Sequence, residues 1–280
     1  MFTNSLKCTL MVALSTVFIP FFGHAKMSQE FTVNKVDEYK YTVSLTSFDG
    51  SALNAKLQLP DIKKSKYPIL ISLHGMARSQ NRVWQGEYKG GKTLENTHQI
   101  TQNALNKGFA VLAIDARYHG ERKVKEIGLV QILKELESQK YDNYNRMILD
   151  TVADYKVLIS QLDKVEQLDT NNIQLVGYSM GAQMALLIAG QVPAVKHVYA
   201  MVPPGVAAKR AEVSPIANAH KITDAEVMLF TANQDQYATQ AENAELFNNL
   251  GTSNKLMVEF DADHLLPEHY VQVLNKLWSL

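Results

Sequence analysis

Residues 174–190 read QLVGYSMGAQMALLIAG, and this stretch decides the fold class of the chain. An apolar run typical of a buried strand passes through Gly177, Ser179 and Gly181 into a segment typical of a helix. A Gly-x-Ser-x-Gly turn at such a junction can hold a nucleophilic serine, because the glycines give the sharp turn room. Glycine and serine are also common in ordinary turns, so the motif alone leaves both interpretations open.

The segments around this stretch repeat its pattern of a strand followed by a helix. Continuous apolar runs predict strands buried on both faces, and they lie at YPILISLHG (67–75), FAVLAIDARYHG (109–120), NIQLVGYS (172–179), VKHVYAMVPP (195–204), EVMLFTANQD (226–235) and KLMVEFDADH (255–264). Apolar residues three and four apart predict the helices, at 94–108, 145–162, 180–191, 239–251 and 267–280. Two alternating runs around FDGS predict an antiparallel hairpin over 39–60.

Strands that alternate with helices predict an α/β fold with a mainly parallel central sheet flanked by helices. We expect residues 26–280 to form a single domain of this kind, with the antiparallel hairpin at its N-terminal end. Residues 121–144 and 205–225 do not fit the alternation, and each follows the carboxyl end of a predicted strand. Open α/β sheets place their ligand crevice there, so the two segments are interpreted as lid elements or as long connections.

The charges of the chain balance, with 28 lysines and arginines against 28 aspartates and glutamates. The hydrophobic share of 46% and the charged share of 20% are typical of a globular protein with one large core. A balanced charge argues against a nucleic acid or an anionic membrane as the partner.

The first 25 residues have the pattern of a secretory signal peptide. Lys7 precedes an apolar run that ends at the small residues Gly23 and Ala25. We predict cleavage after Ala25, export to the periplasm or the medium, and no stable membrane insertion afterwards; an uncleaved anchor is the alternative. Cys8 is the only cysteine and lies within 1–25, so the mature chain would hold no disulfide, thiol nucleophile or thiolate metal site.

Polar residues gather where the predicted strands end. His74 and Gly75 end one strand, Ser179 ends another, and Asp235 and His264 follow two later ones. The carboxyl ends of parallel strands meet at one edge of a sheet, so these residues are expected to lie together. A serine hydroxyl needs a base to take its proton, a carboxylate to orient that base and donors for the oxyanion. The set therefore favours a nucleophilic Ser179 over an ordinary turn.

The motifs LHGMA (73–77), DARYHGE (115–121) and GYSMGA (177–182), with the late aspartate and the final-strand histidine, resemble the α/β-hydrolase superfamily. The resemblance is to its dienelactone hydrolase and prolyl oligopeptidase-like side and runs from about Tyr41 to the C-terminus. One departure is Ala182, where the family often has a second glycine. An alanine still allows close packing of the helix against the strand.

This resemblance implies the α/β-hydrolase fold and a role for each matching residue. Ser179 is expected to be the nucleophile, Asp235 the orienting acid and His264 the general base and acid. The backbone N–H groups of Met76 and Met180 are expected to form the oxyanion hole.

Other titratable residues offer alternatives for these roles. His269 is a second candidate base, but it falls in the last predicted helix rather than at a strand end. Asp261 and Asp263 lie too close to His264 in sequence to orient it in the usual way. Asp115 is interpreted as structural, tying together the loop that follows its strand.

Four further residues are predicted to border the crevice as candidate substrate contacts: His74, Arg78, Arg117 and Tyr118. A solvated or loop-anchoring role is the alternative for the long polar ones. His74 and His119 have neither a nearby carboxylate nor HExxH spacing, so we expect them to fix loops rather than to bind zinc. We expect no metal and no cofactor.

Taken together, the residues and the resemblance imply an exported serine hydrolase, a carboxylesterase that cleaves small-molecule esters through an acyl-enzyme. Two alternatives remain. A prolyl oligopeptidase-like serine peptidase uses the same triad, although such peptidases usually carry a large N-terminal domain that the sequence lacks. A non-catalytic binding protein that kept the scaffold is the other.

Overall fold

A computed structural model describes residues 31–206 and 210–278 of the chain. The predicted signal peptide, including Cys8, lies outside the described residues. None of the helices within the described ranges is long and apolar enough to cross a membrane.

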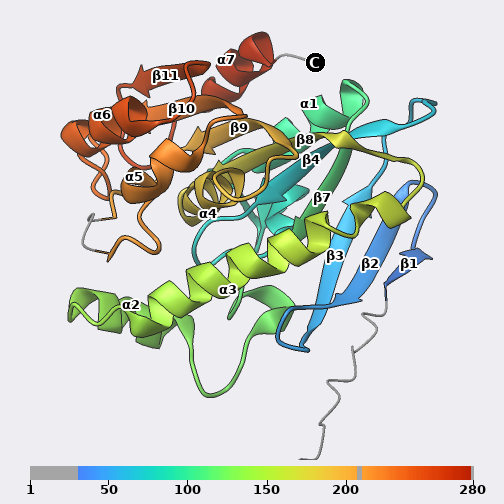
Figure 1. Cartoon of the computed structure of the whole chain (residues 1–280), viewed down its shortest axis with the longest axis horizontal. Helices are drawn as coiled ribbons and strands as arrows, with labels where there is room; N and C mark the ends of the chain where they lie inside the picture. The colour runs from blue at the N-terminus through green and yellow to red at the C-terminus, as the bar shows by residue number, and fades with distance from the viewer. Residues whose placement is uncertain (1–30, 207–209, 279–280) are drawn as a thin grey trace, which may run out of the picture.

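The central sheet has nine strands in the order β1-β2-β3-β7-β4-β8-β9-β10-β11 (Figure 1). Their bounds are β1 Thr32–Lys35, β2 Lys40–Thr46, β3 Ala52–Gln58, β4 Tyr67–Leu73, β7 Ala110–Ile114, β8 Leu168–Tyr178, β9 Val195–Met201, β10 Glu226–Ala232 and β11 Lys255–Phe260. The six strands from β7 to β11 in this order are parallel to one another, whereas β1, β2 and β3 pair antiparallel at one edge, and β3 also pairs antiparallel with β7. The predicted mainly parallel sheet and its antiparallel hairpin are confirmed, and β1 adds one strand to the hairpin.

Helices cover both faces of the sheet, and Figure 1 shows α3 and α4 running across one of them. Their bounds are α1 Thr97–Asn106, α2 Leu129–Glu137, α3 Asp142–Ile159, α4 Met180–Ala189, α5 Pro215–Asn218, α6 Gln240–Asn249 and α7 Tyr270–Leu277. Short 3₁₀ turns (η1 Gln80–Val83, η2 Gly120–Arg122, η3 Leu162–Lys164, η5 Ala219–Lys221) and a small hairpin (β5 Glu87–Tyr88, β6 Gly91–Lys92) complete the connections.

The two faces of the sheet bury two separate apolar clusters. In β4, Ile69, Ile71 and Leu73 join the cluster under α3 and α4, while Leu70 joins the cluster under α1 and α7. Alternate strand residues point to opposite faces, so a strand covered on both faces must be apolar throughout. This is the physical reason for the continuous apolar runs in the sequence.

The carboxyl end of the parallel strands is where the chain leaves the regular pattern. Residues 121–144 contain the end of η2, all of α2 and the start of α3, and the described part of 205–225 contains α5 and η5. Both segments follow strand ends, β7 and β9 respectively, on the edge at which Ser179 also stands. The polar strand-end residues therefore share one edge of the sheet.

Candidate active site

Ser179 stands on a strained turn between β8 and α4. Its backbone has φ 56° and ψ −119°, a conformation that few side-chain-bearing residues adopt. A Cβ atom at Gly181 would lie 2.1 Å from the carbonyl oxygen of Leu73, and one at Gly177 would lie 2.3 Å from the carbonyl group of Gly181. Only glycine fits at these two positions, so the motif is a steric requirement of the turn.

Three side chains from separate strand ends meet at this turn. The Nε2 atom of His264 lies 2.8 Å from Ser179 Oγ, and its Nδ1 atom lies 2.9 Å from both carboxylate oxygens of Asp235. The Asp235 side chain is 1% exposed. A carboxylate only accepts, so Nδ1 carries the proton and Nε2 offers its lone pair to the serine hydroxyl. The geometry is that of a nucleophile, a base and an orienting acid.

The hydroxyl of Tyr178 fixes the loop that carries His264 through two hydrogen bonds. The buried Tyr178 hydroxyl donates to the His264 carbonyl oxygen at 2.9 Å and accepts the Leu266 N–H at 2.9 Å. The Tyr237 ring lies edge-on to the imidazole of His264, with 4.6 Å between the ring centroids. The backbone N–H of Tyr237 donates to the Asp235 carboxylate at 2.8 Å. These two tyrosines were not predicted from the sequence; the position of Tyr178 directly before the serine was the available signal.

The two predicted oxyanion donors belong to residues that line the same cleft as Ser179. Met180 is the first residue of α4, whose amino end carries partial positive charge. Met76 follows His74 and Gly75 in the loop after β4. Unpaired N–H groups at such a place favour an anion that develops on the substrate.

Two buried histidines position the loops beside the cleft. His74 Nε2 accepts the Ala116 N–H at 3.0 Å, and His119 Nε2 accepts the Ala77 N–H at 3.1 Å. Burial lowers the pKa of His74, and burial together with the neighbouring His74 ring lowers the pKa of His119 to about 4. Both rings are thus neutral acceptors at pH 7. The predicted loop-fixing role is confirmed, and the described residues hold no group of side chains suited to a metal ion.

Asp115 has the structural role predicted for it. Its carboxylate accepts the Gln80 N–H at 2.7 Å and the Glu121 N–H at 2.8 Å, and so joins η1 to the loop after β7. A Cβ atom at Gly120 would lie 2.0 Å from this carboxylate, which explains the glycine at that position.

The cleft over Ser179 encloses about 440 Å³ and is lined by both irregular segments. Leu133 and Leu136 of α2, with Tyr144 of α3, come from residues 121–144, while Val206 and Arg210 come from residues 205–225. The Arg210 guanidinium lies 5.3 Å from the Tyr144 ring centroid. Whether these segments move as lids stays a prediction.

The remaining predicted substrate contacts divide into two groups. Arg78 lines the cleft and pairs there with Glu95, which is mostly buried. His74 is buried and does not line the cleft. Arg117 points elsewhere: it is ion-paired with the fully buried Asp154 at 2.6 Å and ties the loop after β7 to α3. Tyr118 packs on the core instead of lining the cleft, so neither Arg117 nor Tyr118 is placed to contact a substrate there.

His269, the second candidate base, is exposed and lies directly before α7, so it takes no part in the triad geometry.

Comparisons with known proteins agree with this architecture. A family model described as the dienelactone hydrolase family matches residues 86–262. A cold-adapted esterase from an Arctic intertidal metagenomic library is 19% identical, with 89% of this chain and 99% of that chain covered and a TM-score of 0.63. Acetyl xylan esterase 1 from Thermoanaerobacterium sp. is 18% identical, with coverages of 90% and 88% and a TM-score of 0.68.

A third solved structure, described as a dipeptidyl aminopeptidase IV from Bacteroides ovatus, is 13% identical with a TM-score of 0.61. It covers 88% of this chain but only 35% of that one. At these identities the structural likenesses concern the fold. No curated protein sequence matches the chain.

Proposed function

The chain belongs to the dienelactone hydrolase family, and on that premise we propose that it is an exported serine hydrolase that cleaves carboxylic esters through an acyl-enzyme. One observation carries the proposal: the Ser179 hydroxyl lies 2.8 Å from an imidazole that a buried carboxylate orients. The strained turn under Ser179 adds to it, because such strain is kept where the surrounding structure and the function require it.

Acylation begins with proton transfer from Ser179 Oγ to His264 Nε2. As the proton leaves, Oγ attacks the ester carbonyl carbon, and Asp235 stabilises the imidazolium that forms. The carbonyl oxygen becomes an oxyanion, to which the Met76 and Met180 N–H groups donate. The bond from carbon to the leaving oxygen then breaks, and the alcohol departs with the proton from His264. The acyl group stays on Ser179.

Deacylation runs the same steps with water in place of the alcohol. His264 takes a proton from water, the hydroxide attacks the acyl carbon, and the oxyanion returns to the same two N–H groups. The bond to Ser179 Oγ breaks as His264 returns its proton to the serine. The carboxylic acid is released and no residue is consumed.

The lining of the cleft supports a substrate with an apolar group next to the ester. Leu133, Leu136 and Val206 present aliphatic side chains to the space over Ser179, and Leu265 does so beside His264. A volume of about 440 Å³ fits a small ester. We expect turnover to fall steeply once the acyl chain exceeds this space, which a series of nitrophenyl esters of increasing acyl length would measure.

The test of the reaction compares three proteins on a short-chain nitrophenyl ester. Ser179→Ala is expected to lower kcat/KM at least about a thousandfold, because no other group provides the nucleophile. Ser160→Ala, an exposed serine at the end of α3, is the matched control and should keep wild-type turnover. Full activity in Ser179→Ala would refute the proposal. Aminoacyl anilides in the same assay separate an esterase from a peptidase, and N-terminal sequencing of exported protein tests cleavage after Ala25.

A further inference from the structure

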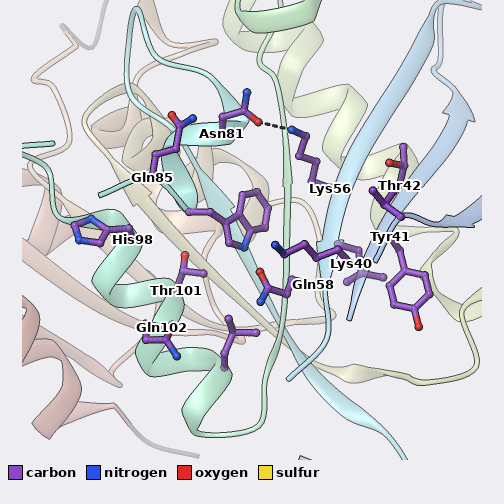
Figure 2. A pocket seen from close by; sticks show the side chains of 14 residues that line it. Lys40, Tyr41, Thr42, Lys56, Gln58, Asn81, Gln85, His98, Thr101 and Gln102 are labelled. Carbon is purple, nitrogen blue, oxygen red and sulfur yellow. Dashed lines mark hydrogen bonds between the residues drawn. The ribbon is translucent and has the colours of Figure 1, made fainter. Parts of the chain in front are cut away.

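A second cavity, of about 480 Å³, lies away from the triad between the β2–β3 hairpin and the segment from η1 to α1. Figure 2 shows the side chains that surround it. We call it the hairpin cavity and define it by Lys40 and Lys56 on one wall and by Asn81, Trp84 and Gln102 on the other. None of the proposed catalytic residues borders it.

The hairpin supplies a polar wall through strand alternation. Thr42 pairs with Lys56, and Lys40 pairs with Gln58, across β2 and β3. Residues two apart share one face of a strand, so these four side chains project from the same face of the hairpin. Val43, the next residue of β2 after Thr42, is fully buried in the core on the opposite face.

Helix α1 forms the facing wall with residues that the helical repeat places on one side of the helix. His98, Thr101, Gln102 and Leu105 are spaced i, i+3, i+4 and i+7, which places them on one side of the helix, and all four line the cavity. Leu105 and Thr101 are buried, so the polar residues of the hairpin face His98 and Gln102 of α1 across the cavity. Among the described lining residues, one side-chain hydrogen bond crosses it, from Lys56 Nζ to the Asn81 amide oxygen (Figure 2).

The side chains that line the hairpin cavity carry positive charge, and Lys56 has no carboxylate partner among the described residues. Within the described part of the chain, no aspartate or glutamate lines the cavity, and no carboxylate comes within ion-pairing distance of the half-buried Lys56. The exposed Lys40 has Asp37 at 3.9 Å, a weak contact. Burial lowers the pKa of His98, so this ring adds hydrogen-bonding capacity without charge. A half-buried ammonium is stabilised when an anion reaches it.

The other groups fit a ligand rich in hydroxyls. The amides of Gln58, Gln85 and Gln102 and the hydroxyl of Thr42 both donate and accept, as sugar hydroxyls require. The Thr101 hydroxyl is buried and donates to the Val83 carbonyl at 2.7 Å, so it is not counted among these groups. The half-buried Trp84 indole adds a flat apolar surface for the face of a sugar ring.

From these groups we propose that the hairpin cavity binds an acidic sugar, with the carboxylate or phosphate of the ligand on Lys56. The amides of both walls and the Thr42 hydroxyl take the sugar hydroxyls. This site is separate from the proposed esterase cleft, and residues 75–85 run from one to the other, because Met76 lines the cleft and Asn81 lines the cavity.

The experiment titrates the full chain with glucuronate, glucose 6-phosphate and neutral glucose by calorimetry, with tryptophan fluorescence as a second signal. At least one acidic sugar should bind saturably and at least about tenfold more tightly than glucose, and the preferred one identifies the anionic group. Lys56→Gln should weaken that binding about tenfold or more. Lys63→Gln, which removes the same charge from an exposed loop, is the matched control and should leave it unchanged.

Three results would overturn the proposal: no saturable binding of either acidic sugar, equal affinities in Lys56→Gln and Lys63→Gln, or competition of the acidic sugar with the ester substrate. The last would place the ligand in the cleft. Gln102→Ala, at an exposed helix position, removes a hydrogen-bonding group without a risk to folding and should weaken binding severalfold. Ester turnover in the Lys56→Gln protein should match wild type, so that failure here is distinct from failure of the proposed catalysis.

Discussion

Tyr178→Phe removes the hydroxyl that clamps the loop of the proposed base. In the native protein this hydroxyl bridges the His264 C=O and the Leu266 N–H at 2.9 Å each, in a site where Tyr178 is 2% exposed. Loss of a partner costs a buried polar group about 1–3 kcal/mol, so two groups lower the free energy of unfolding by about 2–6 kcal/mol. A shift of His264 by about 1 Å lowers kcat on the order of a hundredfold.

Two assays separate the stability effect from the positioning effect. Urea unfolding gives the free energy, and steady-state hydrolysis of a nitrophenyl ester gives kcat and KM. We expect kcat to fall while KM changes little, because the hydroxyl is engaged with the loop and not with the substrate. Tyr270→Phe is the matched control: its hydroxyl is equally buried and donates to the Glu95 carbonyl, so it should lower stability but retain kcat. Wild-type kcat in Tyr178→Phe, or an equal loss of kcat in Tyr270→Phe, would refute the positioning argument.

Three further perturbations follow from the site. The folded-state pKa of His119, about 4, lies below its unfolded value near 6.5, so its contribution to stability is present above pH 6.5 and is lost as pH falls toward 4. Urea unfolding should show a loss of about 2 kcal/mol between pH 7.5 and pH 5 that His119→Gln reduces; an unchanged pH dependence would contradict this. Gly181→Ala should lower the unfolding free energy by about 1–3 kcal/mol and abolish ester turnover, since its Cβ overlaps the Leu73 carbonyl; a fully active variant would show the turn to be less constrained. Asp235→Asn should keep the fold by circular dichroism and lower kcat by about 10⁴-fold, and a small loss would show that His264 does not need this carboxylate.

The architecture could be predicted from the sequence because a strand that is buried on both faces consists of a continuous run of apolar residues. Residues of β4 alternate between two apolar clusters, so YPILI reads as one continuous apolar run. The hairpin was equally legible, since β2 and β3 have one buried and one exposed face. The short β1 strand, Thr32–Lys35, was not predicted, because its residues are mostly exposed and carry no burial pattern.

The candidate site was predictable where topology alone brings residues together. Ser179, Asp235 and His264 each follow the carboxyl end of a parallel strand, and the sheet places those ends at one edge. Side-chain direction was not predictable in the same way. Arg117 is near this edge in sequence, but the buried Asp154 of α3 draws its guanidinium away from the cleft. That pairing joins residues 37 positions apart and leaves no local signal.

The walls of the cleft are likewise fixed by hydrogen bonds between residues that are far apart in the sequence. Gln183, four residues after the serine, accepts from Tyr144 and donates to the Val213 carbonyl at 2.8 Å. It thereby fixes α3 and residues 205–225 around α4. The sequence pattern does not predict a buried glutamine with this role, because the residues around Gln183 in α4 are apolar and buried.

Covalent labelling tests the central claim, a nucleophilic Ser179, most directly. The full chain is treated with a fluorophosphonate, and the label is counted by intact mass and located by peptide mapping. The account predicts one label per chain, on the peptide that contains Ser179, together with loss of ester turnover and no label on Ser179→Ala. A protein that hydrolyses esters while Ser179 stays unlabelled, or that carries the label on another residue, would contradict it.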